Sequence, residues 1–319
     1  MKWSGMMTKI KDLKEKDRLK INLMIKSCTK GTTSKGAPYL NLILQDNSGT
    51  IDGKMWDAKP QDEANAVQGH VCEVSFEVLE YNHSLQLRVN RIQDLDQSGI
   101  NLSEYIQSSS ITRAQSEKRV RDLIASLKNE NYKVLVQAML DKVGDAFYQY
   151  PAASRIHHSY MGGLAEHSLG MAALAEQIVS LYPLLNRDLL IAGTLVHDLG
   201  KTAELGGMIS SEYTNKGRLL GHISIGHAWL AEAADEVGLG DSEEAMLLRH
   251  MVLSHHGKFE FGSPVLPELP EAEALSMIDN LDARMNTLAA ALDGVKPGQW
   301  TPRIFSMENR QFYKAKGSE

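Results

Sequence analysis

Apolar and polar residues alternate along the first part of the chain with the period of two that a β-strand requires. Turn-forming residues separate the alternating runs, most clearly Asp-Asn-Ser-Gly at residues 46–49. The runs lie at residues 20–25, 39–44, 51–56, 71–79 and 85–92. The pattern therefore predicts about five strands, each of which turns every second side chain toward a core.

A short stretch with helical spacing, residues 62–67, lies between the third and fourth predicted strands. Five strands with one helix at that place are typical of a small Greek-key barrel of the oligonucleotide-binding (OB) type. We therefore expect a five-stranded OB-type β-barrel at residues 1–97.

Beyond a polar stretch at residues 94–112, the spacing of the apolar residues becomes helical. The run of serines near the end of this stretch is typical of a linker. The sequence thus predicts an α+β multidomain chain. Its expected parts are the barrel at residues 1–97, a linker at 98–117, an all-α domain at 118–296 and a C-terminal tail at 297–319.

Composition favours a globular protein of the cytoplasm. The 319 residues, 43% of them hydrophobic and 23% charged, suffice for two domains with cores of their own. The two cysteines, Cys28 and Cys72, match neither a disulfide framework nor a Cys-x-x-Cys metal site, which favours a reducing compartment. The sequence has no run of about 18 apolar residues and no signal-peptide core at its N-terminus, so we expect no membrane contact.

Charge is distributed unevenly along the chain. The formal net charge of −6 argues against nucleic-acid binding, because contacts with phosphate need a positive surface. Residues 1–39, however, carry a balance of +7, which leaves −13 for the rest of the chain. A basic N-terminal region fits a barrel that binds nucleic acid, and a solvated lysine-rich surface explains it equally well.

Histidine and aspartate residues of the helical region predict a metal centre. His167 falls on the apolar stripe of a helix expected at residues 164–181, and an almost entirely apolar helix ends in His197-Asp198 just before Gly200, a residue that favours helix ends. A buried imidazole and carboxylate are costly unless something pairs with them, and a divalent cation would do so. Adjacent helix positions diverge by about 100°, so we expect Asp198 to bridge two ions. The further candidate ligands are His222, His255, His256 and Asp279.

These residue types predict a metal-dependent phosphohydrolase. A pair of divalent ions about 3.5–4 Å apart binds a phosphate and makes a hydroxide from bound water. Asp198 and Lys201 are the expected catalytic residues, because the Lys201 ammonium would neutralise charge on the reacting phosphate. The alternative for Lys201 is a lysine placed at a helix C-terminus by the helix dipole. His158 and Arg249 are further candidates for contact with phosphate; a structural hydrogen bond and a surface salt bridge are the respective alternatives.

The order of His, His-Asp and Asp at positions 167, 197–198 and 279 resembles the signature of the HD-domain phosphohydrolase superfamily. The three additional histidines resemble the dinuclear subset of that superfamily. The resemblance implies that one ion is held by His167, His197, Asp198 and Asp279, and the other by Asp198, His222, His255 and His256.

A closer resemblance covers nearly the whole chain. An OB-type barrel followed by an HD domain is the arrangement of the YhaM-type 3′→5′ exoribonucleases of Gram-positive bacteria, and the similarity is carried by residues 157–167 (HHSYMGGLAEH), 197–201 (HDLGK) and 309–314 (NRQFYK). The family implies stepwise hydrolysis of single-stranded RNA, with single-stranded DNA as a second substrate, to 5′-mononucleotides. It implies that the metal is usually manganese. The ligands alone do not fix the identity of the two divalent ions, so iron, cobalt and magnesium are alternatives. A homo-oligomer is compatible with these expectations.

In the predicted barrel, aromatic side chains that stack on bases and basic side chains that follow the backbone would hold a single strand. Ordinary barrel surface is the alternative for each of these residues. The candidates are Lys26, Lys30, Lys35, Tyr39, Trp56, Tyr81 and Arg88.

Two rival function classes fit parts of the pattern. An HD-type nucleotide or cyclic-dinucleotide phosphohydrolase would use the same metal ligands, but it has little need of an oligonucleotide barrel. The Gly-Tyr-Pro tripeptide expected of the cyclic-dinucleotide branch is also absent from the sequence. A non-catalytic nucleic-acid-binding protein is the other rival, and a complete set of ligands argues against it. The exoribonuclease is therefore the preferred prediction.

Overall fold

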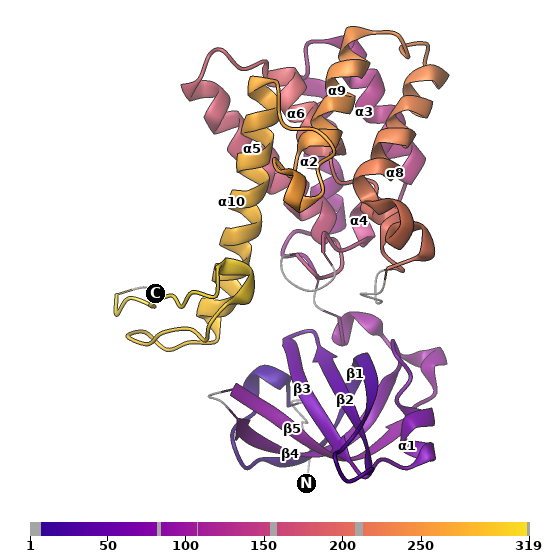
Figure 1. Ribbon diagram of the computed structural model, residues 1–319, viewed down its shortest axis with the longest axis vertical. Helices are drawn as coiled ribbons and strands as arrows, with labels where there is room; N and C mark the ends of the chain where they lie inside the picture. The colour runs from indigo at the N-terminus through magenta and orange to yellow at the C-terminus, as the bar shows by residue number, and fades with distance from the viewer. Residues whose placement is uncertain (1–7, 82–83, 107, 154–157, 208–212, 318–319) are drawn as a thin grey trace. The chain divides into compact units, whose positions relative to one another are not determined.

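The computed structural model describes residues 8–81, 84–106, 108–153, 158–207 and 213–317, and His157 of the sequence motif lies outside these ranges. Contacts divide the chain into two compact units, Met1–Ser108 and Ser109–Glu319. Figure 1 shows strands in the first unit and helices in the second. The predicted fold class, a β-barrel followed by a helical domain, is confirmed.

The strands of the first unit are β1 (Arg18–Thr32), β2 (Pro38–Asp46), β3 (Gly49–Trp56), β4 (Val71–Tyr81) and β5 (Ser84–Asp94). They form a closed barrel in the order β1-β2-β3-β5-β4. The pair β3 and β5 is parallel, and the other neighbours are antiparallel. A short helix, α1 (Pro60–Asn65), connects β3 to β4. This topology is that of the OB fold, as the sequence predicts.

Closure of the barrel depends on β1, which pairs with β2 along one half and with β4 along the other. The register with β2 shifts between Ile25 and Ser27, and a bulge of this kind bends a strand. Alternate side chains fill the interior, as the period-two pattern requires. The core includes Leu23, Ile25, Leu40, Leu42, Leu44, Val74, Phe76, Val78, Leu87, Val89 and Ile92.

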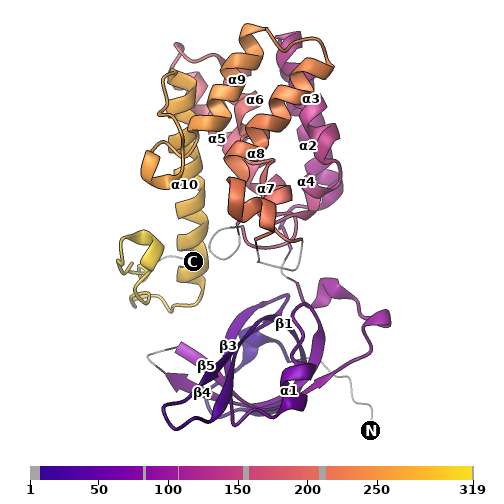
Figure 2. The same cartoon turned by 45° about the vertical axis from the view of Figure 1, so that its right-hand side comes forward.

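The second unit is helical. Its main helices are α2 (Arg113–Ser126), α3 (Glu130–Val143), α4 (Ala146–Gln149), α5 (Gly163–Leu181), α6 (Arg187–Val196), α7 (Lys201–Glu204), α8 (Asn215–Glu236), α9 (Glu243–Ser254) and α10 (Pro270–Asp293). Within the described residues, no helix is long and apolar enough to cross a membrane. Figures 1 and 2 both show α10 running from the helical bundle to the C-terminal tail.

The central helix of this unit is α6, because α3, α5, α9 and α10 all pack against it. Every residue from Asp188 to Val196 is buried, which explains the apolar run in the sequence. The Asn186 side chain caps the helix by accepting hydrogen bonds from the backbone N–H groups of Asp188 and Leu189. A chain that leaves the last residue of a buried helix is still in the interior, so the residues that follow Val196 are buried as well.

Part of the segment predicted as a linker has its own structure. Tyr105 and Ile106 are buried, and the carbonyl oxygen of Tyr105 accepts a hydrogen bond from Gln45 Nε2 at 3.1 Å. Helix α2 begins at Arg113, before the predicted end of the linker at residue 117. The domain boundaries derived from the sequence stay a prediction.

Removal of the Phe76 ring is expected to weaken the barrel. Phe76 is 2% exposed, and Phe76→Ala would leave a cavity that lowers the free energy of unfolding by about 3–5 kcal/mol. Hydrogen exchange of peptides from β4 measures the change, because exchange from the core of the barrel reports its opening. The matched control is Tyr81→Ala on the same strand, where the side chain is 66% exposed. If peptides from β4 were equally protected from hydrogen exchange in Phe76→Ala and Tyr81→Ala, the assignment of Phe76 to the barrel core would be contradicted.

Candidate functional site

All seven predicted metal ligands converge in the helical unit. They come from five places in the chain, which the fold brings together. His167 lies on α5, His197 and Asp198 follow the last residue of α6, His222 lies on α8, His255 and His256 follow α9, and Asp279 lies on α10. Ligand atoms of His167, His197 and Asp279 lie within 4.8 Å of one another, and so do those of His222, His255 and His256.

Asp198 lies between these two groups, with one carboxylate oxygen toward each. Its Oδ2 is 3.2 Å from His197 Nε2 and 3.8 Å from His167 Nε2. Its Oδ1 is 3.5 Å from His222 Nε2 and 3.5 Å from His255 Nε2. His167 Nε2 is also 3.2 Å from Asp279 Oδ1. A carboxylate placed in this way can bind two cations at once.

Hydrogen bonds at Nδ1 orient the imidazoles. Three of the rings face backbone carbonyl oxygens, which only accept hydrogen bonds, so Nδ1 must carry the proton. In a neutral ring, Nε2 then offers its lone pair to the centre, as in metal sites where outer hydrogen bonds fix the tautomer. The pairs are His197 with Thr194 O at 3.1 Å, His255 with Val252 O at 2.8 Å and His256 with Phe261 O at 2.7 Å.

For the two remaining histidines, carboxylates form the hydrogen bonds at Nδ1 that orient the rings. His167 Nδ1 lies 2.7 Å from Asp282 Oδ2, and His222 Nδ1 lies 3.1 Å from Glu204 Oε1. Sequence reasoning missed both acids. Asp282 follows Asp279 by three residues on α10, a spacing that brings side chains close on a helix surface and could have been noticed. Glu204 had no such signal, because its partner is 18 residues away.

Several atoms that face the centre are buried and have no hydrogen-bond partner among the described residues. They are Nε2 of His197, His222 and His255, and Oδ1 of Asp198. Leaving a polar atom in this state costs about 1–3 kcal/mol. Divalent cations would bind all of these atoms, and imidazole nitrogen with carboxylate oxygen is a donor set that suits transition ions. The residues therefore fit the metal ions predicted from the sequence.

Glycines allow the ligand segments to approach one another. Gly200 does not end α6 through a left-handed conformation, since its φ is −59°. A Cβ atom at Gly200 would lie 2.1 Å from the carbonyl oxygen of His222, so glycine is needed there for close packing of α8. Gly221 has φ of 71° and breaks α8 just before His222, and Gly257, with φ of 74°, turns the chain just after His256.

Burial and charge set the protonation of the histidines. Burial lowers the pKa of His256 to about 4, with repulsion from His255 as the next cause, and burial also lowers the pKa of His255. For His167 burial alone would lower the pKa, but hydrogen bonds to Asp279 and Asp282 outweigh it and raise the pKa to about 9. At neutral pH, His255 and His256 are thus ready to bind a cation, whereas His167 holds a proton that the cation must displace.

The candidates for contact with phosphate differ in their surroundings. Lys201 Nζ lies 2.5 Å from Asp198 Oδ2, and Lys201 belongs to the single turn of α7, so the alternative of a helix C-terminus stays open. Both ring nitrogens of His158 are occupied, by Tyr160 Oη at 2.7 Å and Asp282 Oδ2 at 2.8 Å, which favours a structural hydrogen bond over contact with substrate.

Arg249 Nε donates to His227 Nε2 at 3.1 Å, so its partner is an imidazole and not the carboxylate of a salt bridge.

Comparison with known proteins places this geometry in a family. The model of the HD domain matches residues 164–284, which include all seven candidate ligands. A 3′-5′ exoribonuclease YhaM from Bacillus pumilus (strain SAFR-032) is 45% identical over 299 residues, covering 93% of this chain and 95% of that protein. The protein of the same name from Bacillus subtilis (strain 168) is 45% identical over 293 residues, covering 92% and 93%.

This chain belongs to the YhaM family of 3′-5′ exoribonucleases. A second model, described as a putative helicase, matches residues 107–188, a range that contains no phosphate-binding loop of the G-x-x-x-x-G-K-[ST] type. Among solved structures, the second OB-fold domain of replication protein A from Methanococcus maripaludis is 24% identical, with a TM-score of 0.24, and covers 28% of this chain and 96% of that domain. The strand order identifies the barrel without that likeness.

The barrel of this YhaM-family chain carries an exposed aromatic platform. Tyr39 and Trp56 face each other across β2 and β3, with ring centroids 5.2 Å apart. Lys54 Nζ lies 5.0 Å and 4.8 Å from the two centroids. The Tyr39 ring lies over Gly31, where a Cβ atom would be 2.3 Å from the ring. Sequence reasoning missed Lys54, although alternation along β3 puts it on the same face as Trp56.

Of the other predicted barrel contacts, Arg88 lies beside Lys54 of this Tyr39–Trp56–Lys54 platform, because the two residues pair in the parallel register of β3 and β5. Lys30 Nζ pairs with Glu63 at 2.7 Å, and Arg88 pairs with Glu77. Tyr81 is exposed at the end of β4, Lys35 lies in the turn between β1 and β2, and Lys26 lies at the register shift of β1. Their contacts with nucleic acid stay a prediction.

Asp282→Asn is expected to weaken metal binding without a change at any candidate ligand. The carboxylate holds His167 and His158 together, and loss of its charge would lower the basicity of His167. Affinity for Mn²⁺ should fall about 10- to 100-fold, the usual effect of removing such a partner. Titration calorimetry measures it, with Asp293→Asn at the exposed end of α10 as the control. Unchanged affinity in Asp282→Asn would refute the orienting role.

Metal affinity is also expected to rise with pH. His167 keeps a proton below its pKa of about 9, and a cation must displace that proton. For one displaced proton, affinity should increase about tenfold per pH unit between about pH 6 and 8. Calorimetric titration of Mn²⁺ in two buffers of different ionisation enthalpy counts the protons released. An affinity independent of pH, with no release of protons, would show that His167 is not a ligand.

Proposed function

We propose that this chain hydrolyses single-stranded RNA from the 3′ end to 5′-mononucleotides at a centre of two divalent metal ions, with single-stranded DNA as a second substrate. The family relationship supports the polarity and the choice of RNA. The free thiols of Cys28 and Cys72 support a location in the cytoplasm. We also propose a homo-oligomer, which size-exclusion chromatography would test.

One observation carries the proposal of a two-ion centre. The two oxygens of Asp198 face separate groups of buried imidazoles, and Asp198 itself is 2% exposed. A single-ion site would leave one of the two groups, with its buried Nε2 atoms, without a partner. The proposed first ion is bound by His167, His197, Asp198 and Asp279, and the second by Asp198, His222, His255 and His256.

Metal ions bound at these residues would supply a hydroxide at neutral pH and would neutralise charge on the phosphate oxygens. We propose manganese, which the mixed imidazole and carboxylate donor set accommodates, with iron, cobalt and magnesium as alternatives. Two ions bring more positive charge than the carboxylates of Asp198 and Asp279 cancel. The remaining charge favours a phosphodiester with its negative oxygens at the centre.

The chain's own residues prepare the centre for this chemistry. Hydrogen bonds at Nδ1 hold the imidazoles in place before substrate arrives, so little reorganisation is needed. Lys201 places an ammonium group beside Asp198, at 2.5 Å from Oδ2. From there it is available to a phosphate oxygen, where its compact charge would stabilise the charge that builds up during hydrolysis. Asp198 and Lys201 are thus the proposed catalytic residues.

The OB barrel is the proposed binding module for the strand. OB folds bind single strands on the face of their second and third strands, and the Tyr39–Trp56–Lys54 platform lies on β2 and β3. Rings of this kind stack on bases without regard to sequence, which suits an enzyme that degrades many RNAs. A nucleotide hydrolase with small substrates would have no use for such a surface.

A time course on end-labelled RNA tests the function. Purified protein with Mn²⁺ should shorten 5′-labelled single-stranded RNA in steps, and a 3′ label should appear at once as mononucleotide. Asp198→Asn should lower the rate more than about 100-fold, since it removes charge from the residue shared by both ions and even weaker, outer-shell changes reach that size. Asp241→Asn, at an exposed position in the turn before α9, is the matched control.

Each alternative has its own signature in this experiment. Release of mononucleotide first from the 5′ label would reverse the proposed polarity. Intact RNA together with hydrolysis of free nucleotides or cyclic dinucleotides would replace the exonuclease by a small-nucleotide hydrolase. If the protein bound RNA without hydrolysing any substrate, the alternative of a non-catalytic nucleic-acid-binding protein would be supported.

A further inference from the structure

The C-terminal tail folds into a hairpin of its own. Backbone bridges pair Trp300 with Tyr313 and Ile304 with Arg310. Thr301 is buried, and its N–H donates to the carbonyl oxygen of Phe312 at 2.8 Å. An ordered hairpin can therefore present side chains in fixed positions, which a disordered tail cannot do.

Two contacts fasten this hairpin to α10. Arg284 on α10 donates two hydrogen bonds to the Glu308 carboxylate, Nη1 to Oε1 at 2.9 Å and Nη2 to Oε2 at 3.1 Å. Lys314 Nζ donates to the carbonyl oxygen of Leu292 at 2.8 Å. Paired arginine–carboxylate bonds of this geometry are strong and directional. The hairpin is thus held by the helix that also carries Asp279.

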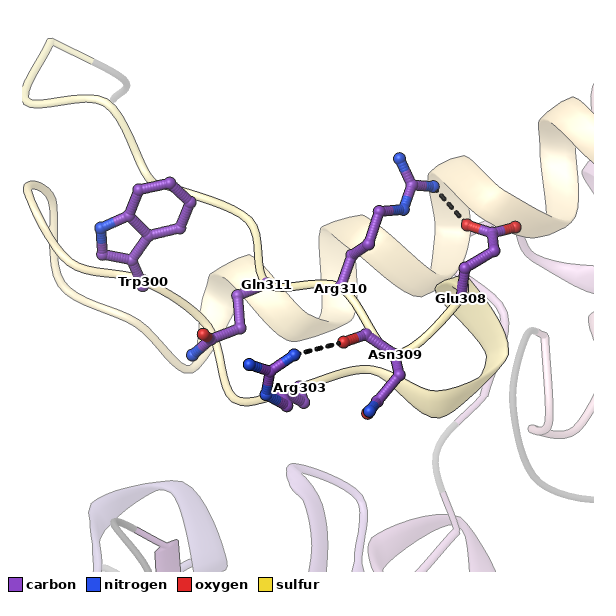
Figure 3. A pocket seen from close by; sticks show the side chains of 6 residues that line it. All are labelled: Trp300, Arg303, Glu308, Asn309, Arg310 and Gln311. Carbon is purple, nitrogen blue, oxygen red and sulfur yellow. Dashed lines mark hydrogen bonds and ion pairs between the residues drawn. The ribbon is translucent and has the colours of Figure 1, made fainter.

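An open pocket of about 570 Å³ lies in the hairpin. This volume is within the range of about 300–1,000 Å³ that small-molecule sites occupy. Figure 3 shows the side chains that line it, with Trp300 toward one end and Glu308 toward the other. The lining residues are Trp300, Arg303, Glu308, Asn309, Arg310 and Gln311.

Positive charge is in excess at this pocket. Glu308 is shared by Arg284 and Arg310, and the Arg284 hydrogen bonds are the main reason that the pKa of Glu308 is lowered to about 2. Arg303 makes no ion pair among the described residues; its Nη1 donates to the carbonyl oxygen of Asn309 at 3.1 Å. The whole chain has a net charge of −6, so this local excess runs against its composition. It attracts phosphate.

The backbone at the pocket is strained. Glu308 and Asn309 have φ of 54° and 57°, in the left-handed region. Asparagine adopts this region readily, so the energetic cost falls on Glu308, which the bonds from Arg284 and Arg310 hold in place. Strain that the surrounding contacts maintain is a frequent mark of binding sites.

The uncharged groups of the pocket match a nucleobase. Trp300 is 62% exposed although it is the largest aromatic side chain, and indole faces of this kind stack on unpaired bases. Gln311 Nε2 already donates to the carbonyl oxygen of Thr301 at 2.9 Å. Its Oε1 is an acceptor, and it would accept from the exocyclic amine of a base such as adenine.

We propose that the tail pocket binds one nucleotide of single-stranded RNA, with its base on Trp300 and its phosphate on Arg303, as a second strand-binding site besides the barrel. The choice of RNA as the ligand rests on the proposed function. The site lies outside the metal centre, so it contributes to holding the strand and not to hydrolysis itself.

Fluorine NMR of the full-length chain labelled with 5-fluorotryptophan tests the pocket directly. The Trp300 resonance is assigned by its loss in Trp300→Phe. On addition of short oligoadenylate, in EDTA to prevent cleavage, this resonance should shift. Fluorescence anisotropy with the same oligonucleotide should show affinity reduced about five- to 150-fold in Trp300→Ala, the range expected for one stacked base. Arg303→Ala should weaken binding too, whereas Trp300→Phe should retain most of it.

The matched control is Phe305→Ala, which removes a fully exposed ring of the same hairpin that does not line the pocket. The proposed binding of RNA in the pocket would be overturned if the Trp300 resonance did not move while RNA bound. It would also be overturned if Trp300→Ala and Phe305→Ala lost equal affinity for RNA. If that resonance shifts but Mn²⁺-loaded protein leaves RNA intact, the pocket stands and the proposed function fails. If RNA is degraded and the resonance does not move, the function stands and the pocket fails.

Discussion

A buried carboxylate between two groups of imidazoles is the constraint on which the helical unit depends. Burial alone would raise the pKa of Asp198, but the Lys201 ammonium, followed by His197, lowers it well below the ordinary range. An ionised carboxylate in the interior costs several kcal/mol unless opposite charges surround it. The buried helix α6 delivers Asp198 to this position, and the surrounding helices supply the groups that keep it charged. Metal ions bound on both of its oxygens would complete this compensation.

Helix α10 connects the parts of this arrangement. Asp279 faces the metal centre, Asp282 holds His167 and His158, and Arg284 fastens the C-terminal hairpin, all within six residues of one helix. The position of a ligand and the position of the proposed tail pocket therefore depend on the same rigid element. In the barrel, by contrast, the platform of Tyr39, Trp56 and Lys54 depends on strand register and on the space that Gly31 leaves for the Tyr39 ring.

The sequence predicted the barrel, the helical domain and the convergence of the ligands, because each of these follows from periodicity or from a short motif. It did not reveal the contacts that orient the ligands. Nothing in the linear pattern connects Glu204 to His222, and only folding brings the two together. The spacing of Asp282, three residues after Asp279, was within reach of the helical pattern. Gly200 shows the same limit: the sequence predicts a helix end, whereas close packing against His222 is the physical reason for glycine. The position of Lys54 was within reach of the alternation along β3.

Anomalous diffraction at the manganese edge, from crystals grown with Mn²⁺, tests the central claim most directly. The account predicts two peaks on opposite sides of Asp198. One should lie within bonding distance of His167 and His197 Nε2, and the other within bonding distance of His222 and His255 Nε2. A single peak, or two peaks that Asp198 does not bridge, would contradict it.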